Sequence, residues 1–159
     1  MLVLLLVIGA FLVFRELNRT TPESMVRTVD YVQVAEFARA EASFDVLVPE
    51  SLPPGWRATT ATYTPGADEA WHLGLLTDED KYVGLEQAAS SPSAMVETHV
   101  GEEAVRGEAV RIEGRSWTSW SDDGGDDALV RRDGDTTTLV VGTTGQDVLA
   151  DYVGSLVPR

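Results

Sequence analysis

The densest group of side chains that could bind a metal ion is SDDGGDD, residues 121–127, in which four carboxylates surround two glycines. A calcium-binding loop places its ligands at alternate positions and ends on a bidentate glutamate. No glutamate follows this segment at the required distance. We therefore expect a solvated turn between two strands and no metal site.

Histidine is the next residue type that could act as a ligand or a base, and the chain has two, His72 and His99. They are far apart in the sequence, and neither lies in a zinc-binding spacing such as H-E-x-x-H. His72 follows Trp71 in a strand pattern, so the two side chains should lie on opposite faces of a sheet. We expect both histidines to have structural roles and the protein to need no cofactor.

Other catalytic signals are missing from the sequence. There is no cysteine, which excludes disulfides, thiolate nucleophiles and thioether lipid anchors. No nucleophile elbow, phosphate-binding loop or dinucleotide-binding glycine motif occurs. We predict that the protein is not an enzyme, because an active site would have to be assembled from Asp, Glu, Ser and His residues that no motif marks.

The charge of the chain restricts its partners. The net charge is −14, and the 12 basic residues are scattered through the sequence. Such a chain repels phosphate backbones, so we expect no nucleic-acid binding.

Large aromatic residues recur at the starts and middles of predicted strands. The simplest interpretation is a core built from large side chains. The alternative is that Trp56, Trp71 and Trp117 line a groove for an apolar ligand. In SWTSW, residues 116–120, strand alternation places Trp117 and Trp120 on opposite faces. One of these two tryptophans therefore needs a helix, a partner or a ligand to cover it.

The chain begins with fourteen apolar or small residues, MLVLLLVIGAFLVF, followed by Arg15. At about 1.5 Å per residue, this segment is too short to cross a hydrocarbon core of about 30 Å. A signal peptide would need basic residues before it and a cleavage site after it, and a soluble strand would alternate. We predict a transmembrane anchor at residues 1–16 whose true start lies upstream, with a cleaved signal or a soluble element as the alternatives.

A polar, proline-broken stretch follows the anchor, and we predict a juxtamembrane tether at residues 17–29. The rest, residues 30–159, is predicted to be an extracytoplasmic domain of a single-pass protein of the cell membrane. Charge alone does not set this topology, because Arg15 and Arg19 lie on the domain side of the anchor.

The domain is predicted to alternate helices and strands. Asp30 and Ser91 are typical helix N-caps, the second followed by proline in a helix that runs to about Val100, and Thr144 with Asp147 resembles a capping box. Strand character occurs at Arg57 to Thr64, Ala70 to Leu76, Tyr82 to Gln87, Glu108 to Ile112, Arg115 to Trp120, Ala128 to Arg131 and Thr136 to Val141. We predict an α+β fold with one curled antiparallel sheet of about seven strands, two or three packed helices and the N-terminal transmembrane helix.

Several motifs resemble a family of actinobacterial single-pass membrane proteins with an exported domain of unknown function. They are SFDVLVPESLPPGW, WHLGLL, YVGLEQA, GRSW and ALVRRDGDTTTLVVGTTGQDVLADYVGSL. A more distant likeness, of layout only, is to LolA-like lipid carriers and exported domains attached to anti-sigma factors.

Two functions are consistent with the predicted anchor and the acidic surface. The first is a non-catalytic domain that binds an envelope protein or acts as an accessory subunit of a membrane complex. The alternative, implied by the LolA-like layout, is a domain that binds a lipid or another apolar ligand.

Overall fold

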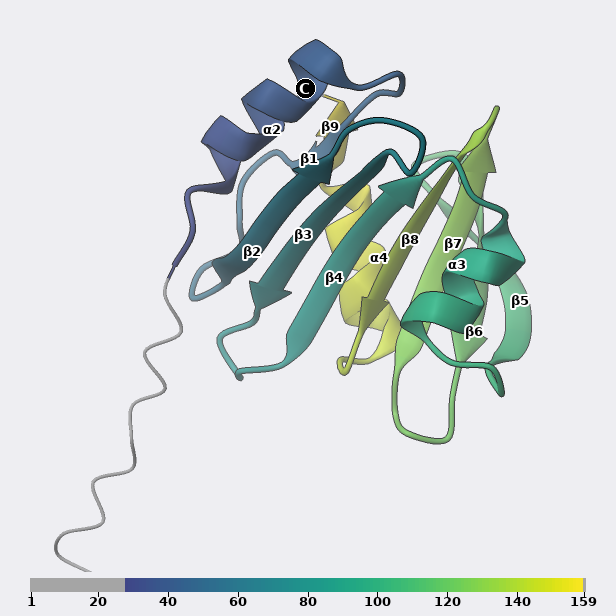
Figure 1. The fold of residues 1–159 in the computed structure, drawn as a ribbon. Helices are drawn as coiled ribbons and strands as arrows, with labels where there is room; N and C mark the ends of the chain where they lie inside the picture. Colours follow the sequence, from purple (N-terminus) through teal and green to yellow (C-terminus); the bar gives the residue numbers. More distant parts are fainter. Residues whose placement is uncertain (1–27, 159) are drawn as a thin grey trace, which may run out of the picture.

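The computed structural model describes residues 28–158, and seven of their strands form one antiparallel sheet in the order β2-β3-β4-β8-β7-β6-β5 (Figure 1). The bounds are β2 Arg57–Thr64, β3 Ala70–Leu76, β4 Tyr82–Ala88, β5 Val105–Ile112, β6 Arg115–Ser121, β7 Asp127–Asp133 and β8 Thr136–Gly142. The meanders β2 to β4 and β5 to β8 join where β4 pairs with β8. The predicted α+β class and seven strands are confirmed.

The expectation of a curled sheet is wrong. β2 and β5 are edges at opposite ends of an open sheet, and they do not pair with each other. The central strands β4 and β8 are buried over most of their length on both faces. Because separate elements cover the two faces, apolar burial does not require the sheet to close on itself.

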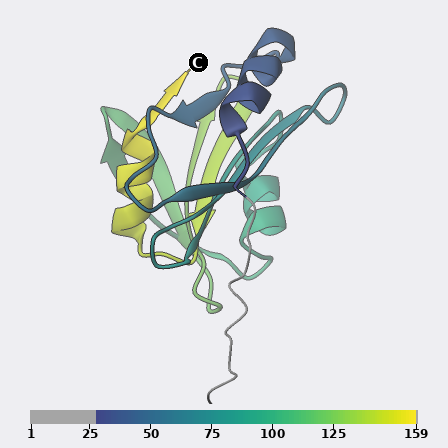
Figure 2. The same cartoon turned by 90° about the vertical axis from the view of Figure 1, so that its left-hand side faces the viewer.

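Three helices pack on this sheet, α2 (Tyr31–Glu41), α3 (Pro92–His99) and α4 (Gln146–Gly154). Figure 2 shows α4 and α3 on opposite sides of the sheet. The predicted caps are confirmed for two helices: Asp30 accepts a hydrogen bond from the Val32 amide, and Ser91 accepts one from Ala94. The third prediction is wrong, because Gly145 is the N-cap of α4 and makes no side-chain cap bond.

A second, two-stranded sheet was not predicted. β1 (Leu47–Pro49) pairs with β9 (Leu156–Pro158), so Leu156 lies in a strand and not in the C-terminal helix. Three residues are too few to show an alternating pattern, and pairing between distant segments leaves no local signal.

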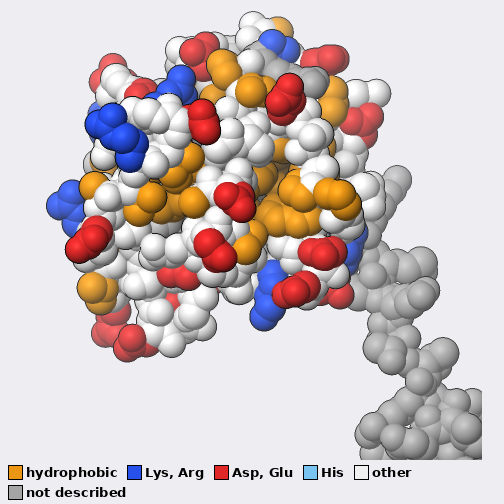
Figure 3. Space-filling model, turned by 180° about the vertical axis from the view of Figure 1, so that it is seen from behind, with side chains coloured by type: hydrophobic (Ala, Val, Ile, Leu, Met, Phe, Trp, Pro, Cys, Tyr) orange, Lys and Arg blue, Asp and Glu red, His pale blue; other side chains and the backbone are white. Residues whose placement is uncertain are grey.

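Two hydrophobic cores lie on the two faces of the main sheet. The first contains Trp71, Leu73 and Leu85 beneath α4, α2 and β1. The second contains Ala128, Val130, Leu139 and Val141 and is covered by Met95, Val96 and Val100 of α3 and its end. Seen from behind (Figure 3), acidic side chains are spread over the surface, with hydrophobic side chains in the hollows between them.

The predicted anchor, residues 1–16, and the tether up to residue 27 lie outside the described residues. Within residues 28–158, no helix is both long and apolar enough to span a bilayer.

Candidate functional site

A row of polar side chains begins where the first core ends. The strand registers place Trp71 opposite Gln87, Gln87 opposite Thr138, and Thr138 opposite Arg131. Directly opposed residues lie on the same face of a sheet. The floor of this end of the sheet is therefore a tryptophan, an amide, a hydroxyl and a guanidinium, side by side.

Gln87 fixes the chain segment that crosses this floor. Its side chain is buried, and its Oε1 accepts a hydrogen bond of 2.7 Å from the Leu47 amide. Its Nε2 donates to the Asp45 carbonyl at 3.1 Å, and the indole of Trp71 donates to the Leu47 carbonyl at 3.0 Å. These bonds satisfy both backbone groups of Leu47 and hold residues 45–47 as a wall beside Thr138 and Arg131.

Arg131 is the charged residue of this floor, and two of its hydrogen-bond donors are unsatisfied within the described domain. Its guanidinium carbon lies 5.4 Å from the centroid of the Trp117 ring, and its Nη2 forms an ion pair with Asp133. Its Nε and Nη1 are buried and have no hydrogen-bond partner among the described residues. Burial and the nearby charge of Arg115 lower the pKa of Arg131.

Gln87, Thr138 and Arg131 of this floor line a cleft of about 1110 Å³. Its walls come from the end of α2, residues 42–47, the end of β4, the start of β6, the β7–β8 hairpin and β9. Its charged residues are Arg39, Asp45, Arg115, Arg131, Arg132, Asp133 and Asp135. We call it the arginine-lined cleft, because it gathers four of the 12 Lys and Arg residues of a chain that has 26 Asp and Glu.

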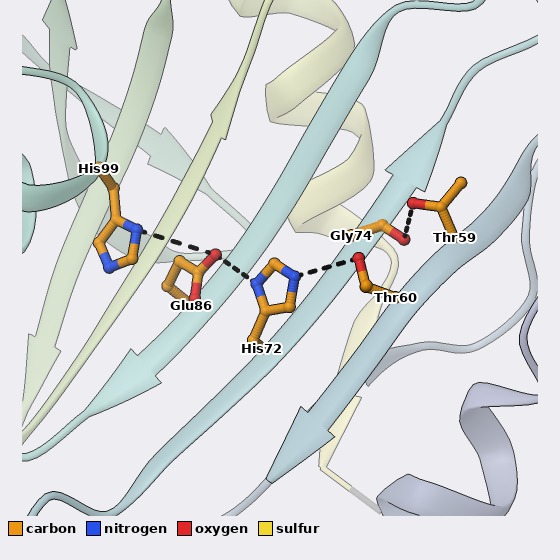
Figure 4. Close-up of polar contacts among 6 residues, drawn as sticks. All are labelled: Thr59, Thr60, His72, Gly74, Glu86 and His99. Carbon is orange, nitrogen blue, oxygen red and sulfur yellow. Dashed lines mark hydrogen bonds and ion pairs between the residues drawn. The ribbon is translucent and has the colours of Figure 1, made fainter. Parts of the chain in front are cut away.

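A second polar group, on the opposite face, contains both histidines (Figure 4). His72 Nδ1 lies 2.6 Å from Glu86 Oε1, and its Nε2 lies 3.2 Å from the Thr60 hydroxyl. His99 Nδ1, at the end of α3, lies 3.9 Å from the same carboxylate oxygen. The hydrogen bond to Glu86 raises the pKa of His72, although burial acts in the opposite direction.

A hydroxyl, an imidazole and a carboxylate in this order also occur in enzymes with an activated nucleophile. Such chemistry needs a cavity for the substrate beside the hydroxyl. Thr60, His72 and Glu86 do not line the arginine-lined cleft.

Gly74 leaves room for the His72 ring. A Cβ at this position would lie 3.3 Å from His72 Nε2 and 2.5 Å from the Thr60 hydroxyl oxygen.

The three tryptophans proposed as ligand-binding residues belong to the first core. Trp71 and Trp117 are 0% and 4% exposed, and Trp56 is partly buried, with its ring stacked on that of Tyr152 at 5.8 Å. None of them lines the arginine-lined cleft. Their role in ligand binding stays a prediction.

The expected alternation of aromatic residues is confirmed. Trp117 packs in the first core, and Trp120 packs against the second, beneath α3. The cover that one of these tryptophans needs is thus supplied by a helix of the same chain.

The acidic segment 121–127 forms the turn between β6 and β7, as predicted, with Asp122 Oδ1 accepting a hydrogen bond from the Asp126 amide at 2.8 Å. Burial and the neighbouring charges of Asp122 and Asp127 raise the pKa of Asp126. In the part of the chain that the structure describes, no three His, Cys, Asp or Glu residues are grouped so as to hold a metal ion.

The arginine-lined cleft was not predicted, because its residues come from positions as distant as Arg39 and Pro158. One signal was present in the sequence. In ALVRR, alternation places Arg131 on the same face as the apolar Leu129. A cation on a core-facing position needs a partner or a polar cavity.

The match to known proteins is at the level of a family. The family described as "Protein of unknown function (DUF4245)" matches residues 1–156. No curated protein matches the chain.

Proposed function

The chain belongs to the DUF4245 family of proteins of unknown function, and we propose that it is a membrane-tethered, extracytoplasmic, non-catalytic domain that binds an envelope protein or serves as an accessory subunit of a membrane complex. The arginine-lined cleft is the proposed docking site for that partner.

Support for the tether comes from the sequence. Fourteen consecutive apolar or small residues precede Arg15, and the polar stretch after them separates this segment from the domain. At the start of the described domain, the Val29 amide donates a hydrogen bond to the carbonyl of Ala58 in β2. The last residue of the proposed tether would therefore lie beside the start of β2.

The arginine-lined cleft is the observation that carries the binding function. It is a concave site whose walls come from segments along the whole described domain, and concavity is a common property of binding sites. Its four arginines outnumber its three aspartates, in a chain where acidic residues are in excess. Arginine stays protonated at physiological pH, so these side chains are suited to hold an acidic partner and not to transfer protons. Both histidines lie outside the cleft.

Site-specific photocrosslinking in membranes tests this function. A photoreactive residue replaces Ser116 in the cleft wall of the full chain, and a matched residue replaces Asp123 in the β6–β7 turn. The two positions lie at opposite ends of strand β6, because Ser116 is near its start and Asp123 follows its last residue, Ser121. We expect one specific protein adduct from position 116 and none from position 123.

Two results would contradict the proposal. Adducts of equal intensity at both positions would indicate random collisions, and an adduct only to lipid at position 116 would favour the alternative function. Deletion of residues 1–16 tests the tether separately, since the domain should then be released from the membrane fraction.

The alternative is a LolA-like domain that binds a lipid in a pocket lined by Trp56, Trp71 and Trp117. It has less support, because Trp71 and Trp117 are packed against neighbouring core residues and the arginine-lined cleft is lined mainly by polar side chains. Native mass spectrometry that finds a lipid retained by the purified protein would favour it.

A further inference from the structure

Arg115 and Arg131 lie near each other in the arginine-lined cleft. Arg115 and Trp117 are two positions apart on β6, so they share a face, and the guanidinium of Arg131 lies over the Trp117 ring. The charge of Arg115 is one of the two causes that lower the pKa of Arg131. Two guanidinium groups thus repel each other in a chain with a net charge of −14.

The neighbouring carboxylates leave donors of this pair unused. Asp133 pairs with Nη2 of Arg131, and Asp135 lies 3.8 Å from Arg132. Within residues 28–158, Arg115 forms no ion pair, and Nε and Nη1 of Arg131 have no hydrogen-bond partner. Buried, unsatisfied guanidinium donors cost stability, and their cost falls when an anion accepts their hydrogen bonds.

We propose that the arginine-lined cleft binds an oxyanion, the carboxylate or phosphate group of a ligand, between the guanidinium groups of Arg115 and Arg131. Arg115 is exposed and makes the first contact. Arg131 lies deeper and adds its positive charge, and the stack on Trp117 holds its guanidinium plane in place. Guanidinium forks match the oxygen spacing of both anions.

This inference rests on the proposed function only in using the same cleft, and it names the chemical group that the cleft recognises. The net charge of −14 opposes anion binding elsewhere on the surface, and binding in the cleft should weaken as salt screens the arginine charges.

The test follows thermal unfolding of the full chain in a phosphate-free, nonionic detergent. Inorganic phosphate, acetate and chloride are titrated separately at matched ionic strength and pH, with tryptophan fluorescence as the readout. A bound anion raises Tm with a saturable dependence on its concentration. We expect this for phosphate, acetate or both, relative to chloride, and the more effective anion identifies the ligand group.

Two variants separate site binding from general salt effects, because phosphate stabilises folded proteins without a site. Arg115→Gln removes an exposed charge of the cleft and should weaken the apparent affinity about tenfold or more, the usual effect of losing a charged hydrogen bond. Arg111→Gln is the matched control, since Arg111 is exposed on β5 and does not line the cleft. It should bind as the unaltered chain does.

The inference is overturned if neither anion gives a saturable rise above chloride, or if Arg115→Gln and Arg111→Gln respond identically. These outcomes leave the docking proposal standing, because a partner crosslinked at position 116 could bind without an oxyanion. Conversely, anion binding without any crosslinked partner would refute the docking function and support the oxyanion site.

Discussion

His72 and Glu86 are directly opposed on β3 and β4, and only 2.6 Å separates Nδ1 of the imidazole from Oε1 of the carboxylate. Glu86 is 8% exposed, so its charge is largely withdrawn from water. The imidazolium form of His72 is the partner that compensates this charge best, which explains why the pKa of His72 is raised.

The first prediction concerns this pair. The pKa of His72, followed by NMR, should lie above its ordinary value of 6.5, and Glu86→Gln should lower it. Because the raised pKa belongs to the folded state, the stabilisation is complete below about 6.5 and is lost as pH rises through the folded pKa of His72. Urea unfolding of the full chain should therefore show stability falling with pH in that window.

His99→Gln is the control for this prediction, since it leaves the bond between His72 and Glu86 in place. It should retain the fall in stability, whereas Glu86→Gln and His72→Gln should flatten it. A titration of His72 at or below 6.5 would show that burial outweighs the hydrogen bond.

The second prediction concerns the Tyr152 hydroxyl. The side chain is 2% exposed, and its hydroxyl has no hydrogen-bond partner among the described residues. Burial raises the pKa of this phenol. Tyr152→Phe removes the unsatisfied group and keeps the stack on Trp56, so it should raise the free energy of unfolding by about 1 kcal/mol.

Tyr63→Phe is the matched control, because the Tyr63 hydroxyl donates to Glu69 at 2.6 Å and this bond raises its pKa to about 12. It should bring no gain in stability. A loss of stability in Tyr152→Phe, measured by urea unfolding, would indicate that the buried hydroxyl has a partner after all.

The third prediction concerns Gly142 at the end of β8. A Cβ there would lie 2.5 Å from the Tyr82 carbonyl oxygen and 3.1 Å from Leu149 Cδ2. The backbone of β4 cannot move away without breaking its pairing with β8. Gly142→Ala should lower the free energy of unfolding by about 2 kcal/mol, the usual cost of overpacking.

Gly154→Ala provides the comparison, since the nearest atom to its Cβ would be Ile112 Cγ2 at an ordinary 3.7 Å. At the last residue of α4, alanine should be neutral or stabilise by about 0.5 kcal/mol. Equal losses for the two variants in chemical denaturation would refute the close approach at Gly142.

The fourth prediction concerns the Gln87 amide. Gln87→Leu keeps a similar volume and leaves the Leu47 amide and the Asp45 carbonyl without their partner. It should cost about 2 kcal/mol and speed hydrogen exchange at the Leu47 amide. Gln146→Leu, which loses only an exposed contact of 3.4 Å to Asp127, should do neither. Unchanged exchange at Leu47 in Gln87→Leu would show that β1 is held by other contacts.

Features that depend on neighbours in the sequence could be predicted. The caps at Asp30 and Ser91, the bounds of β2 and β3 and the opposed faces of Trp117 and Trp120 follow from side-chain chemistry and strand alternation. The β7–β8 loop is Gly134 and Asp135, and Gly134 takes the positive φ of 57° that its first position requires.

Only the tertiary structure decided which distant segments meet. The pairing of β4 with β8 sets the polar row from Trp71 to Arg131, and β1 reaches this row because Gln87 and Trp71 bind the backbone of residues 45–47. The pairing of His72 with Glu86 and the gathering of four arginines likewise depend on strand register. Local hydrogen-bond and burial preferences determine where a strand begins and ends, whereas its partners are selected by the packing of both faces of the whole sheet.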